Sequence, residues 1–323
     1  MHVRDIGLNL DYIGPWRKLD QLERQLDHFR ALGFRLIEID ITPFHLIVNG
    51  EIHQKSLNAF WGVIRNFDLR YTIHGLLRLN LAYDSRRALC EQIMRSQIEI
   101  CRAIGASVLV YHSGLQALDE VRYGVRETLL SDAELLEGAR QEVDAFRRLA
   151  PLAADAGVII GMENGDTHLW EHRQMARFGL PREVLAKYHA RIRIAPIVRQ
   201  LEAIAHPNIG LAVDVGHLYI AAQDMGFDYL SEIAQAGPWL KHIHLSDNFG
   251  RLDRGFDDEA ERWAFGEADV HMPPGWGEIP YHQIFACWPD YHGDIIIELK
   301  PAFFDVAQDA RHTLQTLIEC TTA

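Results

Sequence analysis

The sequence has few cysteines and no long apolar run, and both shortages exclude whole classes of protein. Its four cysteines, Cys90, Cys101, Cys287 and Cys320, form no C-x-x-C pair, so neither a disulfide framework nor a thiolate metal site is expected. We interpret them as buried thiols in a reducing compartment. No stretch approaches the roughly 18 apolar residues of a membrane span, and the first residues do not resemble a signal peptide. A cytoplasmic protein without a membrane partner is expected.

Positive charge is scarce as well. The chain carries 45 acidic residues against 32 Lys and Arg, a formal net charge of −13. Because nucleic-acid binding depends on neutralising phosphates, this balance argues against a nucleic-acid partner. A G-x-G-x-x-G fingerprint is also absent, since Gly7 and Gly14 stand too far apart, and nucleotide cofactors lose support. The expected partner is a small-molecule substrate, with a homo-oligomer left open.

What the chain does contain is a regular alternation of strand and helix patterns. The first unit is the strand "DIGLNL", an amphipathic segment over 19–32 and the strand "FRLIEIDI". Six further strands are predicted in "YTIHG", "VLVYHSG", "GVIIGMENG", "IGLAVDVGH", "LKHIHLSDN" and "DIIIELKP", with helices near 56–67, 85–104, 133–156, 182–205, 225–236 and 303–318. Eight such units favour a single (β/α)8 TIM barrel over residues 1–323, ahead of an open doubly wound sheet.

Three connections are longer than a barrel requires, near 113–132, 164–195 and 248–268. All three follow strand ends, where loops cover the active site of a barrel. We expect lid-like insertions that select the substrate, although a surface or oligomer contact stays open. The residues expected to bind substrate at this rim are Arg78, Trp170, Arg173, Asp247, Arg251 and Trp276.

Imidazoles and carboxylates recur where the apolar runs end. The nine candidates are His74, His112, Glu163, Asp214, His217, His244, Asp269, His271 and Glu298. Buried acids gathered at one rim would be costly without a cation, which predicts a shared metal site. Nitrogen and oxygen ligands without sulfur favour zinc, manganese, iron or cobalt. Of the pair in "HIH", His244 is nearer the rim and is the better ligand, with His242 one layer deeper.

The order, spacing and strand context of these residues resemble the xylose-isomerase-like TIM barrel superfamily, which includes endonuclease IV and sugar phosphate isomerases and epimerases. The resemblance runs from "FRLIEIDI" to "ELKP" and includes H-x-x-x-x-x-N-L from His74 to Leu81. By resemblance to endonuclease IV, up to three zinc ions are implied. One would lie among His74, His112 and Glu163; a second among Glu163, Asp214, His244 and Glu298; a third among His217, Asp269 and His271.

The resemblance to the DNA enzyme is incomplete. That enzyme inserts an aromatic and an aliphatic residue into the duplex from the loop after its first histidine strand, whereas this chain has Leu77 and Arg78 there. Together with the charge of −13, this argues against duplex DNA as substrate. In sugar isomerases and epimerases of the superfamily, the positions of Glu163, Asp214, His244 and Glu298 form a single-metal site.

Two mechanisms therefore compete. We favour a multinuclear metal-dependent hydrolase of a small phosphate ester or phosphodiester, with Glu163 and Glu298 orienting the nucleophile and His217 as a third catalytic residue. The alternative is a ketose isomerase or epimerase in which Glu163 and Glu298 exchange protons with neighbouring carbons and His217 binds a sugar oxygen. A sugar-binding protein without catalysis is disfavoured, because paired carboxylates around a metal are seldom idle.

Overall fold

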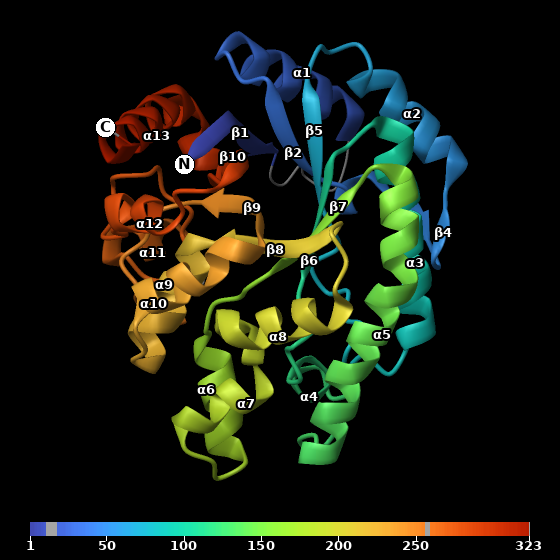
Figure 1. Ribbon diagram of the computed structural model, residues 1–323, viewed down its shortest axis with the longest axis vertical. Helices are drawn as coiled ribbons and strands as arrows, with labels where there is room; N and C mark the ends of the chain where they lie inside the picture. The colour runs from blue at the N-terminus through green and yellow to red at the C-terminus, as the bar shows by residue number, and fades with distance from the viewer. Residues whose placement is uncertain (11–17, 256–258, 323) are drawn as a thin grey trace.

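The computed structural model describes residues 1–10, 18–255 and 259–322, and eight parallel strands form its centre (Figure 1). The strands are β1 (His2–Leu10), β2 (Leu36–Asp40), β5 (Arg70–His74), β6 (Val108–His112), β7 (Ile159–Glu163), β8 (Ile209–Asp214), β9 (Leu240–Leu245) and β10 (His292–Ile297). They close in the order β1-β10-β9-β8-β7-β6-β5-β2. The predicted TIM barrel is confirmed.

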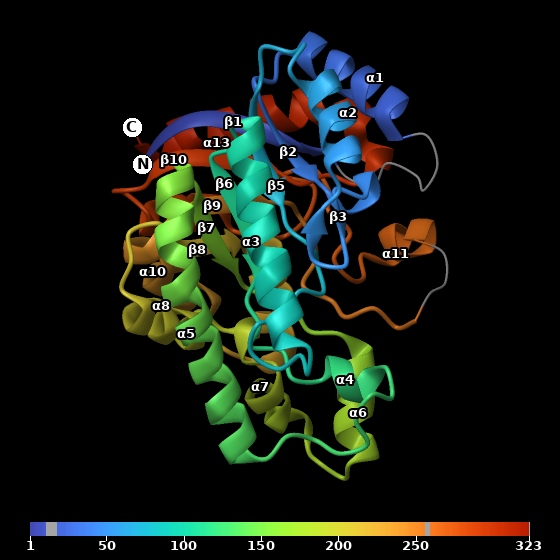
Figure 2. The same ribbon diagram turned by 90° about the vertical axis from the view of Figure 1, so that its right-hand side faces the viewer.

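The helices surround the barrel, and capping residues mark the ends of the longest one. The main ones are α1 (Lys18–Ala31), α2 (Gln54–Ile64), α3 (Arg87–Ile104), α5 (Asp132–Ala156), α8 (Ile194–Ile204), α9 (Val215–Met225), α10 (Tyr229–Ala236), α12 (Tyr281–Cys287) and α13 (Ala307–Thr322). Helix α5 starts with a capping box between Ser131 and Glu134 and ends at Gly157, whose φ is 70°. Its 25 residues carry it well beyond the barrel (Figure 2).

Several sequence predictions need correction. The helix expected over 182–205 is divided into η2 (Arg182–Val184), α7 (Leu185–Tyr188), η3 (Ala190–Ile192) and α8. The helix expected over 225–236 is shorter in the structure, where it is α10 (Tyr229–Ala236). Met225 belongs to a separate helix, α9, which begins directly after Asp214. Only Cys90 and Cys101 are buried, whereas Cys287 is partly exposed and Cys320 is exposed. The two exposed thiols lie on the outer helices α12 and α13, away from the barrel core.

The long connections carry short helices of their own: α4 (Asp119–Arg122), α6 (Leu169–Arg177) and α7 in the first two, and α11 (Glu259–Phe265) in the third. Residues 256–258 of the third predicted insertion lie outside the described residues. In both ribbon views α4, α6 and α7 lie at the end that α5 reaches (Figure 2). Leu118, Met175 and Leu185 share a buried apolar cluster there. The first two connections therefore support each other in one layer beside the barrel.

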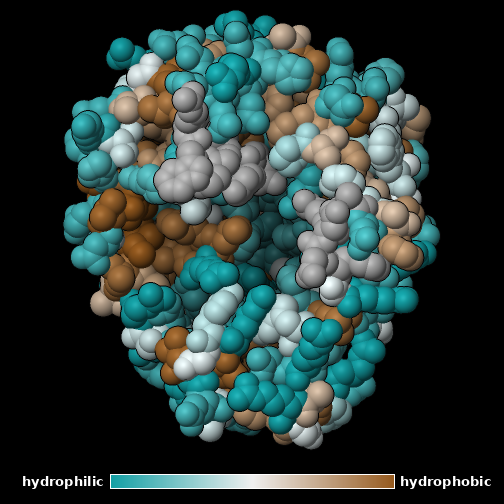
Figure 3. Space-filling view, turned by 180° about the vertical axis from the view of Figure 1, so that it is seen from behind, coloured by the Kyte–Doolittle hydropathy of each residue, from teal (hydrophilic) through white to brown (hydrophobic). Residues whose placement is uncertain are grey.

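One face of the molecule is hollowed near its middle, and hydrophilic residues line that hollow (Figure 3). A hydrophobic patch lies on one side of it (Figure 3).

None of the helices in the described part of the chain combines the length and the apolar character that a membrane span requires.

Candidate metal centre

The barrel register brings the predicted ligands to one height at the carboxyl-terminal rim. His112 is the register partner of Glu163 across β6 and β7, and Asp214 is the partner of His244 across β8 and β9. Glu298 follows the last residue of β10 directly. Parallel strands that end together deliver their terminal side chains to one basin, as the sequence pattern suggested.

Glu163 stands at the centre of this basin. Its Oε2 lies 2.8 Å from Nε2 of His112 and 4.0 Å from Nε2 of His74. Its Oε1 lies 2.8 Å from Nδ1 of His244, and the same Nδ1 is 3.3 Å from Oε1 of Glu298. Glu163 therefore faces ligand atoms on two sides, which is the geometry of a bridging or shared carboxylate.

A residue that the sequence reasoning missed, Glu38 of β2, lies beneath His244. Its Oε1 is 2.8 Å from Nε2 of His244, and its Oε2 is 2.8 Å from Nε2 of His242. Thr72 also donates a hydrogen bond to Glu38 Oε2 at 2.9 Å. A carboxylate on one ring nitrogen fixes the tautomer, so that Nδ1 of His244 presents its lone pair to a metal. His242 lies one layer deeper, as expected.

The remaining three candidates form a separate group at the edge of the basin. Nε2 of His217 lies 3.2 Å from Oδ2 of Asp269, and His271 contacts the same oxygen. The loop that holds Asp269 and His271 is bent by non-glycine residues with positive φ, 65° at Ala268 and 44° at His271. Such backbone strain concentrates at functional sites.

Asp214 is held in place through its backbone. Asn164, which follows Glu163, donates to the Asp214 carbonyl oxygen and accepts from the Asp214 N–H, both at 3.0 Å. The Asp214 carboxylate accepts from the backbone N–H of His217 at 2.7 Å and so caps α9. This clamp fixes the ends of two adjacent strands and the start of the helix that carries His217.

Burial and close charges shift the proton affinities of the basin in opposite directions. Burial raises the pKa of the Asp214 carboxyl to about 7, and the facing His217 offsets this only in part. Burial alone would raise the pKa of Glu163 too, but the imidazoles of His112 and His244 bring it well below its usual range. Burial disfavours a charged His271, yet Asp269 raises its pKa to about 9. Opposite shifts among neighbours indicate a functional site.

The donor set fits a divalent cation. Nε2 of His112 and Oε2 of Glu163 are buried and close, yet neither atom has a hydrogen-bond partner within the described residues. The same holds for Oδ2 of Asp214 and Nδ1 of His217. Buried lone pairs that converge without hydrogen bonds would be costly unless a cation used them. Three-ligand groups form at His74, His112 and Glu163, at His74, His244 and Glu298, at Glu163, Asp214 and His217, and at His217, Asp269 and His271.

Two adjoining cavities give access to the basin. The inner one, of 210 Å³, is lined by candidate ligands including His74, His271 and Glu298. The outer one, of 500 Å³, shares Leu77, His112, His217 and Asp269 with it. Of the residues predicted to bind substrate, Arg78, Trp170 and Arg173 line the outer cavity.

The other three predicted substrate residues line neither of these cavities. Asp247 is buried and accepts hydrogen bonds from the backbone N–H groups of Asn248, Gly275 and Ile279, so it braces a loop. Arg251 donates to the carbonyl oxygen of Phe265. Trp276 packs edge-on against Phe303, with ring centroids 5.7 Å apart. Their position offers no support for a contact with substrate.

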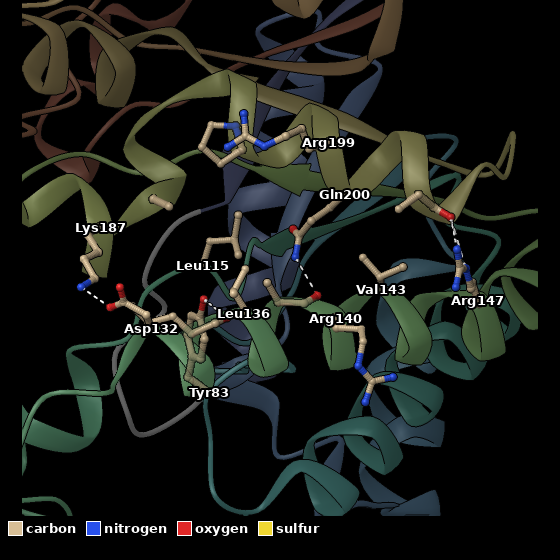
Figure 4. A pocket seen from close by; sticks show the side chains of 15 residues that line it. Tyr83, Leu115, Asp132, Leu136, Arg140, Val143, Arg147, Lys187, Arg199 and Gln200 are labelled. Atoms are coloured by element: carbon tan, nitrogen blue, oxygen red, sulfur yellow. Dashed lines mark hydrogen bonds and ion pairs between the residues drawn. The ribbon is translucent and has the colours of Figure 1, made fainter.

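A further cavity, of 630 Å³, lies between α5 and α8, away from the basin (Figure 4). Its apolar lining includes Leu115 and Val143, and three of its charged groups are engaged: Lys187 pairs with Asp132, and Arg147 donates to the carbonyl oxygen of Ala203 at 2.6 Å (Figure 4). None of the candidate metal ligands lines it. Size alone therefore does not identify the active site.

The chain is similar to a known protein family and to several solved structures. A family model described as the xylose isomerase-like TIM barrel matches residues 26–320. A search of curated proteins returns no match. Among solved structures, the chain is similar to D-psicose 3-epimerase with D-tagatose from Clostridium cellulolyticum H10, with a TM-score of 0.66, 14% identity, and coverage of 97% of this chain and 99% of the epimerase.

Two further structures extend this likeness. An L-ribulose 3-epimerase has a TM-score of 0.64 and 15% identity, with 99% of this chain and 96% of the epimerase covered. A xylose isomerase-like TIM barrel protein from Mycobacterium smegmatis in complex with magnesium has a TM-score of 0.65 and 17% identity, with 99% and 98% covered. At such identities the likeness establishes the fold.

These comparisons correct the favoured sequence prediction. Similar structures named for their activity are sugar 3-epimerases, which contradicts the phosphoester hydrolase and favours its alternative, the isomerase or epimerase. The physical reason for the error is that the ligand pattern encodes the metal basin and not the reaction. One constellation of imidazoles and carboxylates supports several chemistries on the same barrel.

Proposed function

Because the chain belongs to the xylose isomerase-like TIM barrel family, we propose that it is a metal-dependent ketose isomerase or epimerase. The observation that carries this proposal is the arrangement of two carboxylates about one imidazole. Oε1 of Glu163 and Oε1 of Glu298 lie 2.8 and 3.3 Å from the same Nδ1 of His244. They come from β7 and from the end of β10, and so approach from different sides of the basin.

Glu163, Asp214, His244 and Glu298 would hold the catalytic cation, as the superfamily resemblance implies. When bound, a divalent cation polarises a carbonyl and its neighbouring hydroxyl and so acidifies the C–H bond beside the carbonyl. Zinc, manganese, iron and cobalt suit this donor set. The third group, His217, Asp269 and His271, would bind a sugar oxygen or a further cation.

The proton transfer itself falls to the two glutamates. One carboxylate takes the proton from the carbon beside the carbonyl, and the electrons of that C–H bond move into the carbonyl group to give an enediolate. The second carboxylate returns a proton to the same carbon from the opposite face, which inverts it, or to the neighbouring carbon, which isomerises the sugar. The lowered pKa of Glu163 keeps its carboxylate ionised, as a base must be before it accepts a proton.

Deuterium exchange tests this proposal directly. Metal-loaded protein would be incubated with a panel of ketoses in D2O. We expect deuterium to appear on the carbon beside the carbonyl group, and NMR measures this incorporation. Glu163→Gln and Glu298→Gln should each lower the exchange rate by about 10²- to 10⁴-fold, the usual contribution of general acid–base catalysis. Glu137→Gln, on the exposed surface of α5, is the matched control and should change nothing.

The opposite result is equally clear. If no ketose exchanges a proton while small phosphate esters are hydrolysed by the same metal-loaded protein, the isomerase and epimerase proposal is wrong. Unaltered exchange in both glutamine variants would also reject the assigned roles.

A further inference from the structure

The outer cavity beside the metal basin gathers arginines. Five line it: Arg78, Arg122, Arg173, Arg191 and Arg262. They come from the loops after β5, β6 and β7 and from the third insertion. This concentration stands out on a chain whose formal net charge is −13, because arginine is the residue best suited to bind carboxylate and phosphate in a fork.

Two of these arginines are occupied within the protein. Arg262 pairs with Asp253 at 2.9 Å, and Arg191 donates to Nε2 of His189 at 3.1 Å and to the Ser113 carbonyl oxygen at 3.3 Å. The other three differ. Within the part of the chain that the structure describes, no carboxylate lies within the 4.0 Å ion-pair distance of Arg78, Arg122 or Arg173.

Aromatic rings hold two of the three without using their hydrogen bonds. The Arg122 guanidinium lies over the Trp170 ring, 4.1 Å from its centroid, and the Arg78 guanidinium lies over Tyr123 at 4.5 Å. Stacking positions a guanidinium while its N–H groups, which lie in the plane, stay free to bind a ligand. Nε1 of Trp170 is buried and also lacks a hydrogen-bond partner among the described residues.

The acids of the same cavity do not cancel these charges. Glu171 is buried and engaged, 2.8 Å from Nδ1 of His189, and it accepts from Nε2 of Gln116 at 2.7 Å. Asp269 faces His217 and His271 in the metal basin. Asp253 is paired with Arg262, as described. Asp119 and Asp166 remain, and Asp166 lies 3.6 Å from Nδ1 of His168, so three guanidiniums without an ion pair face two carboxylates.

From this arrangement we infer that the substrate carries an anionic group, a carboxylate or a phosphate, which Arg78, Arg122 and Arg173 bind in the outer cavity while the reacting carbons occupy the metal basin. This inference rests on the proposed function for the reaction and adds the substrate class. The psicose and ribulose of the similar epimerases are uncharged sugars, so the substrate of this chain would differ from theirs in its charge. The cavity of 500 Å³ is large enough for a sugar with such a group.

Exchange measurements on matched sugars test the inference. Each ketose would be offered to the metal-loaded enzyme in neutral form, as its terminal phosphate and as its terminal carboxylate, for example D-fructose, D-fructose 6-phosphate and D-fructuronate. We expect one anionic form to exchange with a kcat/KM at least about tenfold above its neutral parent. A higher value for the phosphate or for the carboxylate identifies which anion is bound. Equal or faster exchange of the neutral sugars would overturn the inference.

Variants locate the anion within the cavity. Arg122→Gln and Arg173→Gln should lower the ratio of anionic to neutral kcat/KM by about 10- to 100-fold, mostly through KM, because each removes a charge-assisted hydrogen bond. Arg122→Lys should restore part of the ratio. Arg199→Gln, in the separate cavity between α5 and α8, is the matched control. A ratio that none of the outer-cavity variants alters would reject the assignment.

A binding measurement separates this inference from the proposed reaction. Inorganic phosphate titrated calorimetrically into the metal-loaded protein should bind, and the double variant Arg122→Gln with Arg173→Gln should weaken that binding by about tenfold or more. This result would stand even if no ketose exchanged a proton. Phosphate affinity unchanged in the double variant would place the anion on the metal alone and would overturn the inference.

Discussion

The two ends of the barrel are both rich in charge, but they arrange it in opposite ways. At the amino-terminal end, Asp294 accepts from Nη1 and Nη2 of Arg70 at 2.8 and 3.0 Å and from Nε of Arg4 at 3.0 Å. Arg70 also donates to Asp5 at 3.1 Å. At the carboxyl-terminal end, Glu163, Asp214 and Glu298 face imidazoles that have alternative protonation states and can ligate metal.

The difference separates stability from function. Burial opposes the charge on Asp294, yet the hydrogen bonds from Arg4 and Arg70 keep its pKa below the usual value, so its ion pairs stabilise the folded state. At the opposite end, burial raises the pKa of Asp214 to about 7, and its Oδ2 has no hydrogen-bond partner among the described residues, so its charged form is poorly satisfied by the protein alone. A site that leaves its charges unsatisfied is prepared for a ligand and costs stability.

Removal of metal should give the largest effect and act on the carboxyl-terminal end alone. Treatment with a chelator should abolish proton exchange on ketoses, because the proposed reaction depends on a bound cation to polarise the carbonyl. Far-ultraviolet circular dichroism should remain that of a folded barrel, since the core and the Asp294 ion pairs do not involve the basin. Restored activity on adding back a divalent metal is the control. Full activity after chelation would contradict the proposal that the reaction depends on a metal.

Glu38→Gln should give the next largest effect. Glu38 lies against Nε2 of His244, on the side of the ring opposite the Glu163 contact, and an outer carboxylate of this kind typically contributes about 10- to 100-fold to metal affinity. We expect that loss in a competition titration against a chromophoric chelator. The exposed Glu137→Gln serves again as control. An unaltered affinity would show that Glu38 stabilises the barrel interior but does not orient His244.

Glu38 also shows where sequence reasoning stops. The nine predicted ligands stand at or just beyond the ends of apolar runs and could be found by that position, whereas Glu38 lies inside the strand segment "LIEID". Its contact with His242 joins residues 204 positions apart, and only closure of the barrel brings β2 and β9 across from one another. The signal that could have found it is a charged residue within a strand that is otherwise buried.

The fold was predictable from the sequence and the reaction was not. Eight buried strands follow from Val-, Ile- and Leu-rich runs, and their order around the barrel follows from right-handed crossovers. Helix α9 was missed because it begins at Val215, directly after the strand that ends in Asp214, and no loop separates the two elements. The choice between hydrolase and epimerase depends on how a substrate would be held in the basin, which the spacing of ligands along the chain does not encode.

Asp294→Asn should lower stability and leave the active site intact. The loss should be about 1–3 kcal/mol in the free energy of unfolding at neutral pH, as for charge-assisted hydrogen bonds. Since the folded pKa of Asp294 is lowered, its contribution is present above its unfolded pKa of about 3.9 and disappears as the pH falls through the folded value. Urea unfolding of both proteins should therefore show a difference that shrinks below about pH 4. A constant difference would mean that packing, and not charge, is lost.

Arg4→Gln should give the smallest effect and sharpen the comparison within the amino-terminal end itself. Both guanidiniums contact both carboxylate oxygens of Asp294, but the Arg4 side chain is 61% exposed and that of Arg70 is 40% exposed, so Arg70 holds Asp294 from the more sheltered position. Exposed ion pairs contribute about 0–1 kcal/mol, and we expect Arg4→Gln to fall in that range while Arg70→Gln costs more, because it also releases Asp5. Urea unfolding of the two variants checks the order. If Arg4→Gln proved the more destabilising, solvent exposure would not set the strength of these ion pairs. The ion pairs of Asp294 would then depend mainly on Arg4.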